Sequence, residues 1–156
     1  AAMAYVASKQ QAGEAVVVTL PPVAWLSVEP ATRDDLHFLA GSEGWTRADR
    51  YTRVTEGGDR IDYWVGIESI VSTRELKALL DDGGDVWVVA DAGRLRDDWT
   101  DESEIRKLIR EEMYPVHIVD GGAVVYRAQP AETVATNKLE DRDEPSQERM
   151  PARNAW

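Results

Sequence analysis

The chain contains no cysteine, and this absence removes several kinds of chemistry at once. Its 156 residues can form no disulfide, no thiolate nucleophile and no zinc site built on sulfur ligands. The absence is compatible with either a reducing or an oxidising compartment. Histidine is nearly absent too: His37 and His117 are the only two, too far apart in sequence to form a two-histidine metal motif on one helix. We expect each to be an ordinary structural or surface residue.

Basic residues and long apolar runs are also in short supply. The chain has 18 Lys and Arg against 29 Asp and Glu, a formal net charge of −11. Because a nucleic-acid binder needs clustered positive charge to displace counterions from phosphates, no nucleic-acid partner is expected. No apolar run approaches the roughly 20 residues that cross a bilayer, and the start lacks a basic segment followed by a signal-type apolar core. As given, the chain is expected to be soluble.

The clearest fold pattern runs from Gly84 to Ala128. Residues 85–91 resemble a buried strand, 101–113 an amphipathic helix, and 114–128 a two-stranded hairpin that turns at an Asp-Gly-Gly sequence. Because strand–helix–strand units are almost always right-handed, residues 116–119 are expected to lie parallel to the first of these strands. The last strand of the hairpin then returns antiparallel.

Other segments support the same class. Residues 15–20 are a β-branched run typical of a strand covered on both faces. Two alternating segments that flank Glu56–Asp59 predict a hairpin, and the capping-box spacing of Ser72 and Glu75 predicts a helix over 73–82. Residues 34–39 can form either a strand or a single helical turn.

The two ends of the chain are read differently. Met3, Val6, Ala7 and Gln10 fall on one face of a short helix, which Gly13 is placed to terminate. Together these patterns predict an α/β domain over residues 1–130: a small mixed, partly parallel sheet flanked by helices, with a C-terminal β-hairpin. Residues 131–156 hold many charges and only isolated apolar side chains, so they are expected to be a disordered tail.

Asp91 is the best single site candidate. It closes a core strand, and open α/β sheets bind ligands just beyond the carboxyl ends of their strands. The glycine-rich phosphate-binding fingerprints are absent, however, and an aspartate that ends a strand is more often a loop cap. The Gly-x-Ser-x-Gly elbow of serine hydrolases is absent as well.

Residues 97–104 concentrate five carboxylates, which are ligands that calcium prefers. An EF-hand loop that opened at Asp91 would need a glycine at its sixth position, where the chain has Arg96. Acidic residues also favour the first turn of a helix, where they complement its dipole. Helix capping is therefore the favoured reading, and a cation site the alternative.

Six tryptophans against one phenylalanine is an unusual balance. Trp87, between valines in a core strand, is expected to pack in the interior. Trp25, Trp45, Trp64 and Trp99 fall in or near loops and strand ends, where a ring either plugs the edge of the core or stacks on a sugar. Burial is the favoured reading, and these four join Asp91 as ligand candidates.

The order of these patterns resembles a known family. The run Ala12-Gly-Glu-Ala-Val-Val-Val-Thr-Leu-Pro-Pro22, then Arg60-Ile-Asp-Tyr-Trp-Val-Gly66 and Ile70-Val-Ser-Thr-Arg-Glu-Leu76, then Asp85-Val-Trp-Val-Val-Ala-Asp91 and Gly121-Gly-Ala-Val-Val-Tyr126, is similar to the soluble carboxyl-terminal domain of multi-pass membrane glycosyltransferases. The similarity is to prokaryotic relatives of the protein mannosyltransferase (family 39) and aminoarabinose transferase group, and it covers roughly residues 2 to 128.

The resemblance implies a domain that lies outside the cytoplasm, after the last membrane span of its parent. In that family the membrane portion transfers a sugar from a polyprenyl-phosphate donor, and its catalytic carboxylates lie near the start of the protein. No catalytic, cofactor-binding or metal-ligating residue is carried onto this chain. The implied partners are the membrane-embedded portion of the parent and a lipid-linked sugar or acceptor.

Two other readings stay open. One is a stand-alone small-ligand-binding α/β protein that uses the strand ends near Thr19 and Asp91. The other is a metal-dependent enzyme, which predicts stabilisation by calcium or magnesium.

Overall fold

The computed structural model describes residues 1–40, 48–82, 85–91, 103–120 and 122–128. The helices and strands of these residues are, in order, α1 Ala2–Ala7, β1 Ala15–Val18, α2 Pro21–Ser27, the 3₁₀ helix η1 Pro30–Asp35, β2 Leu36–Leu39, α3 Ala48–Tyr51, β3 Thr52–Val54, β4 Arg60–Asp62, β5 Glu68–Ile70, α4 Thr73–Asp81, β6 Val86–Asp91, α6 Ser103–Glu112, β7 Met113–Val119 and β8 Ala123–Ala128.

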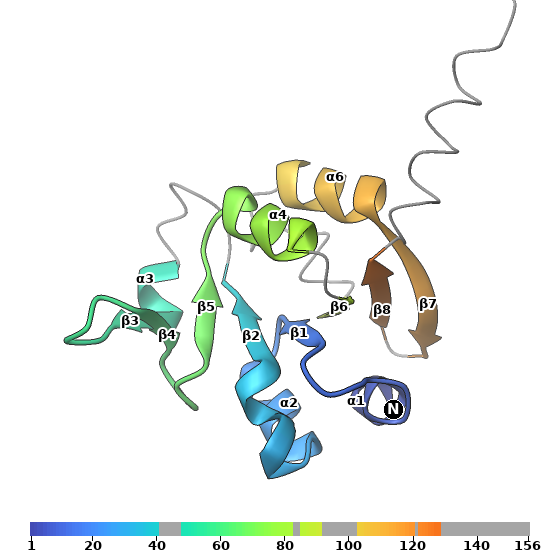
Figure 1. The fold of residues 1–156 in the computed structure, drawn as a ribbon, viewed down its shortest axis with the longest axis horizontal. Coiled ribbons are helices and arrows are strands. Elements are labelled where there is room, and N and C mark those ends of the chain that lie inside the picture. The colour runs from blue at the N-terminus through green and yellow to red at the C-terminus, as the bar shows by residue number, and fades with distance from the viewer. Residues whose placement is uncertain (41–47, 83–84, 92–102, 121, 129–156) are drawn as a thin grey trace, which may run out of the picture.

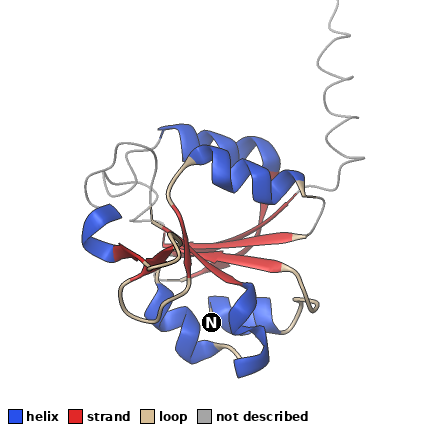
Figure 2. Ribbon diagram, turned by 60° about the vertical axis from the view of Figure 1, so that its left-hand side comes forward, coloured by secondary structure: helices blue, strands red, loops and turns tan. Residues whose placement is uncertain are grey.

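The described strands form one eight-stranded sheet in the order β3-β4-β5-β2-β1-β6-β8-β7. The central strands β5, β2, β1 and β6 pair in parallel, and the strands outside them pair antiparallel. Helices α4 and α6 cover one face, and α1 and α2 cover the other (Figures 1 and 2). The predicted class, an α/β fold with a mixed, partly parallel sheet between helices and a C-terminal hairpin, is confirmed.

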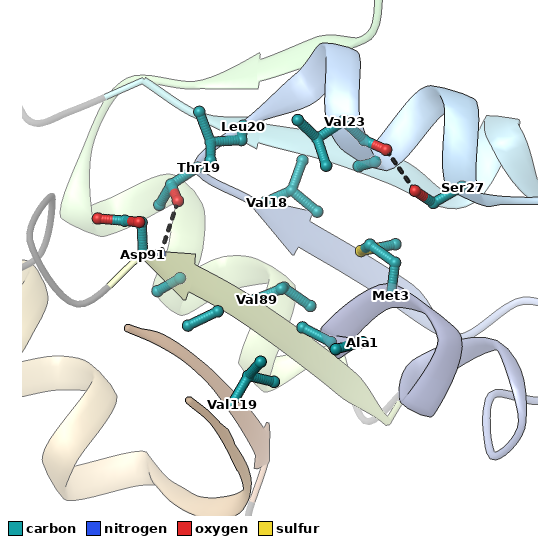
Figure 3. A pocket seen from close by; sticks show the side chains of 14 residues that line it. Ala1, Met3, Val18, Thr19, Leu20, Val23, Ser27, Val89, Asp91 and Val119 are labelled. Carbon is teal, nitrogen blue, oxygen red and sulfur yellow. Dashed lines mark hydrogen bonds between the residues drawn. The ribbon is translucent and has the colours of Figure 1, made fainter. Parts of the chain in front are cut away.

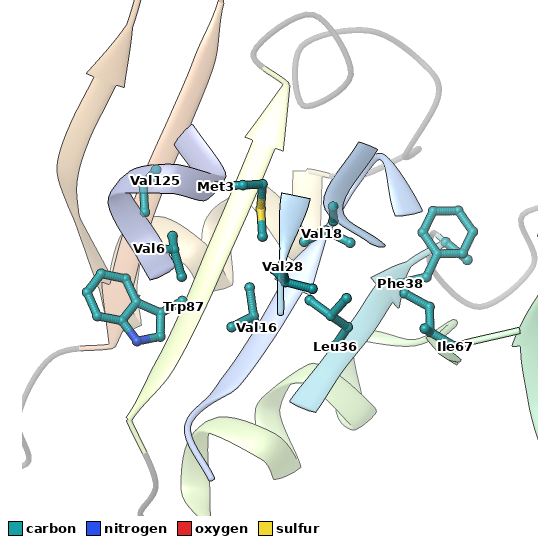
Figure 4. Close-up of a cluster of buried hydrophobic side chains, with 12 residues drawn as sticks. Met3, Val6, Val16, Val18, Val28, Leu36, Phe38, Ile67, Trp87 and Val125 are labelled. Carbon is teal, nitrogen blue, oxygen red and sulfur yellow. The ribbon is translucent and has the colours of Figure 1, made fainter. Parts of the chain in front are cut away.

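The core has two halves, one on each face of the sheet. Val16 and Val18 of β1 point to the α1/α2 side, where they join Trp87 of β6 (Figure 4). Val17, between them, points to the opposite side and packs in a cluster with Leu76 of α4. Because successive side chains of a strand alternate between faces, a strand that serves both halves must be apolar throughout. This explains the unbroken valine run.

The C-terminal hairpin differs from expectation in its position. β7 runs in the predicted direction, parallel to β6, but β8 lies between them and pairs antiparallel with both. The reason lies in β7 itself, which contains Pro115 and a register shift between Pro115 and His117. Proline has no N–H to donate, so such a strand suits the edge of a sheet, whereas β8 has no proline and can pair on both sides.

The expected extent of the first helix is wrong. α1 ends at Ala7 and is capped by Ser8, whose hydroxyl donates to the Tyr5 carbonyl. The chain then bends toward Glu14: the Gln11 N–H donates to the Glu14 carboxylate, and the Gln10 side chain donates to the Glu14 carbonyl. These side-chain bonds compete with continuation of the helix. Gly13, with φ of +85°, lies in the turn before β1 instead.

Elsewhere the sequence patterns hold. β3 and β4 form the predicted hairpin, and Ser72 caps α4 by accepting the Glu75 N–H. The Glu75 carboxylate accepts the N–H of Val71, whereas in a capping box it would accept the N–H of the N-cap residue, here Ser72. For residues 34–39 the sequence allowed either a helical turn or a strand, and the structure contains both, because η1 ends at Asp35 and β2 begins at Leu36. Helix α2 was not expected; it begins at Pro21, since proline is well tolerated in a first helical turn.

Candidate functional site

A pocket of about 260 Å³ lies at the carboxyl ends of β1 and β6 (Figure 3). Its floor comes from these strands, with Val18, Thr19 and Val89, and its walls come from α1 and α2. This is the edge at which open α/β sheets bind ligands, and it is the neighbourhood in which the sequence placed Asp91. The structure therefore brings Asp91 and Thr19 together at a pocket.

The polar groups of this pocket are engaged with the protein itself. The Thr19 hydroxyl accepts the backbone N–H of Asp91 at 3.1 Å, and the Ser27 hydroxyl donates to the Val23 carbonyl at 2.6 Å. In Figure 3 the Asp91 carboxylate extends away from Met3 and Val89. Asp91 thus holds the two strand ends together through its backbone, and the surface offered to a ligand is mainly aliphatic.

A second, larger hollow of about 680 Å³ lies on the other face, between β2, β5 and α4. His37 Nδ1 is 3.5 Å from a Glu68 carboxylate oxygen here. Burial lowers the pKa of His37, and the nearby carboxylates of Glu68 and Asp35 oppose this shift. Within the described ranges, no three His, Asp or Glu side chains are grouped closely enough to hold a metal ion. The hollow is lined by several charged side chains, among them Asp59, Arg60 and Glu75.

The two candidate tryptophans that the structure describes, Trp25 and Trp64, come from different segments of the fold. Trp25 is half-buried on α2, with the Arg33 guanidinium 4.5 Å from its ring centre. Trp64 follows β4, is 53% exposed, and stacks on Tyr51 with 5.4 Å between ring centres. Trp45 and Trp99 lie outside the described residues, as do residues 97–102 of the acidic segment. Trp25 and Tyr51, the ring on which Trp64 stacks, both pack against the core cluster on the α1/α2 face.

Asp62 is a residue that the sequence analysis missed. Its side chain is fully buried and accepts three backbone N–H groups, from Trp64, Val65 and Ile67, at 2.7–3.0 Å. The signal was present, since an aspartate just before a turn commonly binds the amides that follow it. Asp62 organises the turn that carries Trp64, so its role is structural.

Glu14 forms a second polar centre that was missed. Its carboxylate is 2.7 Å from the indole nitrogen of Trp87, which donates to it, and 3.6 Å from the guanidinium of Arg127. Arg127 also pairs with Asp85 at 2.6 Å and lies 4.8 Å from the Trp87 ring centre. Trp87 is 1% exposed, which confirms that it packs in the core. The cluster joins β1, β6 and β8 at the edge opposite the pocket.

The two histidines occupy separate environments. His117 stacks on Tyr5 with 4.3 Å between ring centres, whereas His37 lies on the α4 face. Neither one lines the apolar pocket.

Comparisons with protein families, curated proteins and solved structures found no match to this chain. Among the described helices, none has both the length and the apolar character needed to cross a membrane.

Proposed function

We propose that the chain is a non-catalytic accessory domain of a membrane-embedded glycosyltransferase that uses a polyprenyl-phosphate donor. In this role it lies on the extracytoplasmic face of the membrane and aids access of the donor or acceptor, or docks the membrane-embedded portion of the parent. The activity of the parent is inferred from the family resemblance described above. The site contributes a surface for contact, not a set of reacting groups.

One observation supports contact with an apolar partner: the helix layer of α1 and α2 is uncharged. In a chain with net charge −11, neither helix contains a single charged residue. Val23 and Leu26 on α2 are nevertheless 56% and 83% exposed. The helices of the other layer, α4 and α6, each carry several charged residues. Uncharged helices with exposed aliphatic side chains suit a contact that removes them from water.

The gene itself provides the first test. The sequence upstream of Ala1 should encode several apolar segments of about 20 residues each. A start codon at Met3 with no such segments before it would exclude the proposal.

A second test uses the intact parent protein. Leu26→Asp should reduce sugar transfer from the polyprenyl-phosphate donor, because it places a charge in the contact layer. Val54→Asp provides the matched control, since Val54 is exposed on β3, at the far edge of the sheet from β6. Equal activity of the two variants would argue against docking through this layer.

The pocket favours one alternative, a stand-alone small-ligand-binding protein. Its position at the ends of β1 and β6 is the one that such a protein would use. Stabilisation of the isolated chain by a small ligand, together with the absence of upstream apolar segments, would favour this alternative.

A further inference from the structure

The pocket at the ends of β1 and β6 offers a ligand very few hydrogen-bonding groups. Both hydroxyls of its lining, on Thr19 and Ser27, are already bonded to the backbone. Helices α1 and α2, which form its walls, have no charged side chain. Asp91 is the charged residue of the lining, and its carboxylate extends away from Met3 and Val89 (Figure 3). A sugar, nucleotide or phosphate in this pocket would lose bonds to water and regain few from the protein, which is unfavourable. An uncharged hydrocarbon group has no such cost.

The volume of the pocket limits the size of that group. A dry cavity of about 150 Å³ lined by aliphatic and aromatic side chains holds benzene, which has six carbon atoms. In proportion, the roughly 260 Å³ available here accommodates about ten carbon atoms. The pocket is also slightly smaller than the range typical of sites for drug-sized molecules.

We propose that this pocket binds an aliphatic chain segment of about ten carbon atoms, such as two isoprene units or part of an acyl chain. The inference deepens the proposed function, because it assigns a ligand chemistry to a place in the accessory domain. It needs only the pocket, however, so its failure would leave the upstream-gene and transfer-activity tests unaffected.

Helix α2 supplies a well-matched pair of positions for the test. Val23 lines the pocket and is 56% exposed, whereas Leu26, on the same helix, is 83% exposed and does not line it. The affinity for an aliphatic ligand that enters the pocket should depend on Val23 alone. The affinity for a ligand that only adsorbs to the outside of α2 should depend on both residues.

Val23→Asp is expected to fold. Val23 is the third residue of α2, after Pro21 and Pro22, and an acidic residue in a first helical turn complements the helix dipole. Far-UV circular dichroism and the Tm of each variant check this point. If Val23→Asp does not fold, Val23→Ser provides the same comparison with a smaller expected loss of affinity.

The experiment is a ¹⁵N–¹H NMR titration of the 156-residue protein with geraniol, a branched alcohol of ten carbon atoms, and with 1-octanol, a linear alcohol of eight. We expect saturable shifts at the amides of Val18, Val23 and Val89, with a dissociation constant of roughly 0.1–1 mM. Val23→Asp should weaken binding at least about tenfold, and Leu26→Asp by less than about twofold.

The results distinguish a prenyl ligand from an acyl ligand, and they also show how the proposal can fail. Tighter binding of geraniol supports a prenyl chain, and tighter binding of 1-octanol supports an acyl chain. The absence of saturable shifts at the pocket with either alcohol would overturn the proposal, and would leave an apolar side chain of a partner protein as the occupant. Equal weakening by the two substitutions would also overturn it.

Discussion

Replacement of Glu14 by alanine should destabilise the fold strongly, although Glu14 lies outside the regular strands. The substitution leaves two N–H donors without an acceptor: the indole of Trp87, which is 1% exposed, and the partly buried amide of Gln11. An unsatisfied buried donor costs about 1–3 kcal/mol, and a partly buried one costs less. The lost ion pair with the partly exposed Arg127 adds little. The expected loss is therefore about 2–4 kcal/mol, with a decrease in Tm of roughly 5–15 °C.

Urea unfolding followed by far-UV circular dichroism measures this loss without dependence on tryptophan fluorescence. A double-mutant cycle with Trp87→Phe isolates the bond between the two side chains, and its coupling energy should be at least about 1 kcal/mol. Glu29→Ala is the control, because Glu29 is exposed and should change stability by less than about 0.5 kcal/mol. If Glu14→Ala behaves like this control, or the two substitutions are additive, the reasoning about Glu14 is wrong.

Three further predictions concern the sheet and its turns. Asp62→Ala should cost about 2–4 kcal/mol in the free energy of unfolding, because three backbone amides lose their acceptor, and a loss below about 1 kcal/mol would contradict this. Gly58 has φ of +95°, so Gly58→Ala should lower the free energy of unfolding by about 1 kcal/mol. Gly57→Ala is the control and should be nearly neutral, because its new methyl group would meet only ordinary van der Waals contacts. Equal Tm values for the two variants would refute the distinction. Burial lowers the folded-state pKa of His37 from its ordinary value of 6.5, so the unfolded chain takes up a proton more readily, and stability decreases as the pH falls from above 6.5 through the folded-state pKa. Urea unfolding at about pH 7.5 and about pH 5.5 should therefore show a smaller loss for His37→Gln than for the natural chain, and equal losses would exclude this role.

The sequence predicts the elements of this fold better than it predicts their arrangement. The valine run of β1, the cap at Ser72 and the glycine turn of the β3–β4 hairpin are local signals, and each is found where it was expected. The place of β8 depends instead on which strand can donate hydrogen bonds on both sides. Pro115 indicates that β7 cannot donate hydrogen bonds along its whole length. This matters only once β7 and β8 are both candidates for the position next to β6.

The candidate site shows the same limit. The sequence could place Asp91 at the end of a strand, but it could not show that the contribution of Asp91 to the pocket is a backbone N–H bonded to Thr19, 72 residues away. Nor could it identify Glu14 as the partner of Trp87, because the two are joined only once β1 and β6 lie side by side. Polar residues that close long-range bonds are the part of a site that local patterns do not contain.

The distribution of charge between the two helix layers was readable from the sequence, and it gains meaning only with the topology. Residues 2–7 and 21–27 are uncharged, and the fold places both segments on one face of the sheet, while the charged segments 73–81 and 103–112 cover the other. The chain has a net charge of −11. Where it presents carboxylates, their desolvation opposes contact with an apolar surface, and charge repulsion opposes contact with an anionic one. The α1/α2 layer presents no charged side chain from either of these two helices, although Arg33 of the neighbouring η1 lies over the Trp25 ring. It also contains the pocket, so a chain drawn from an apolar partner would meet the pocket and the exposed Val23 together.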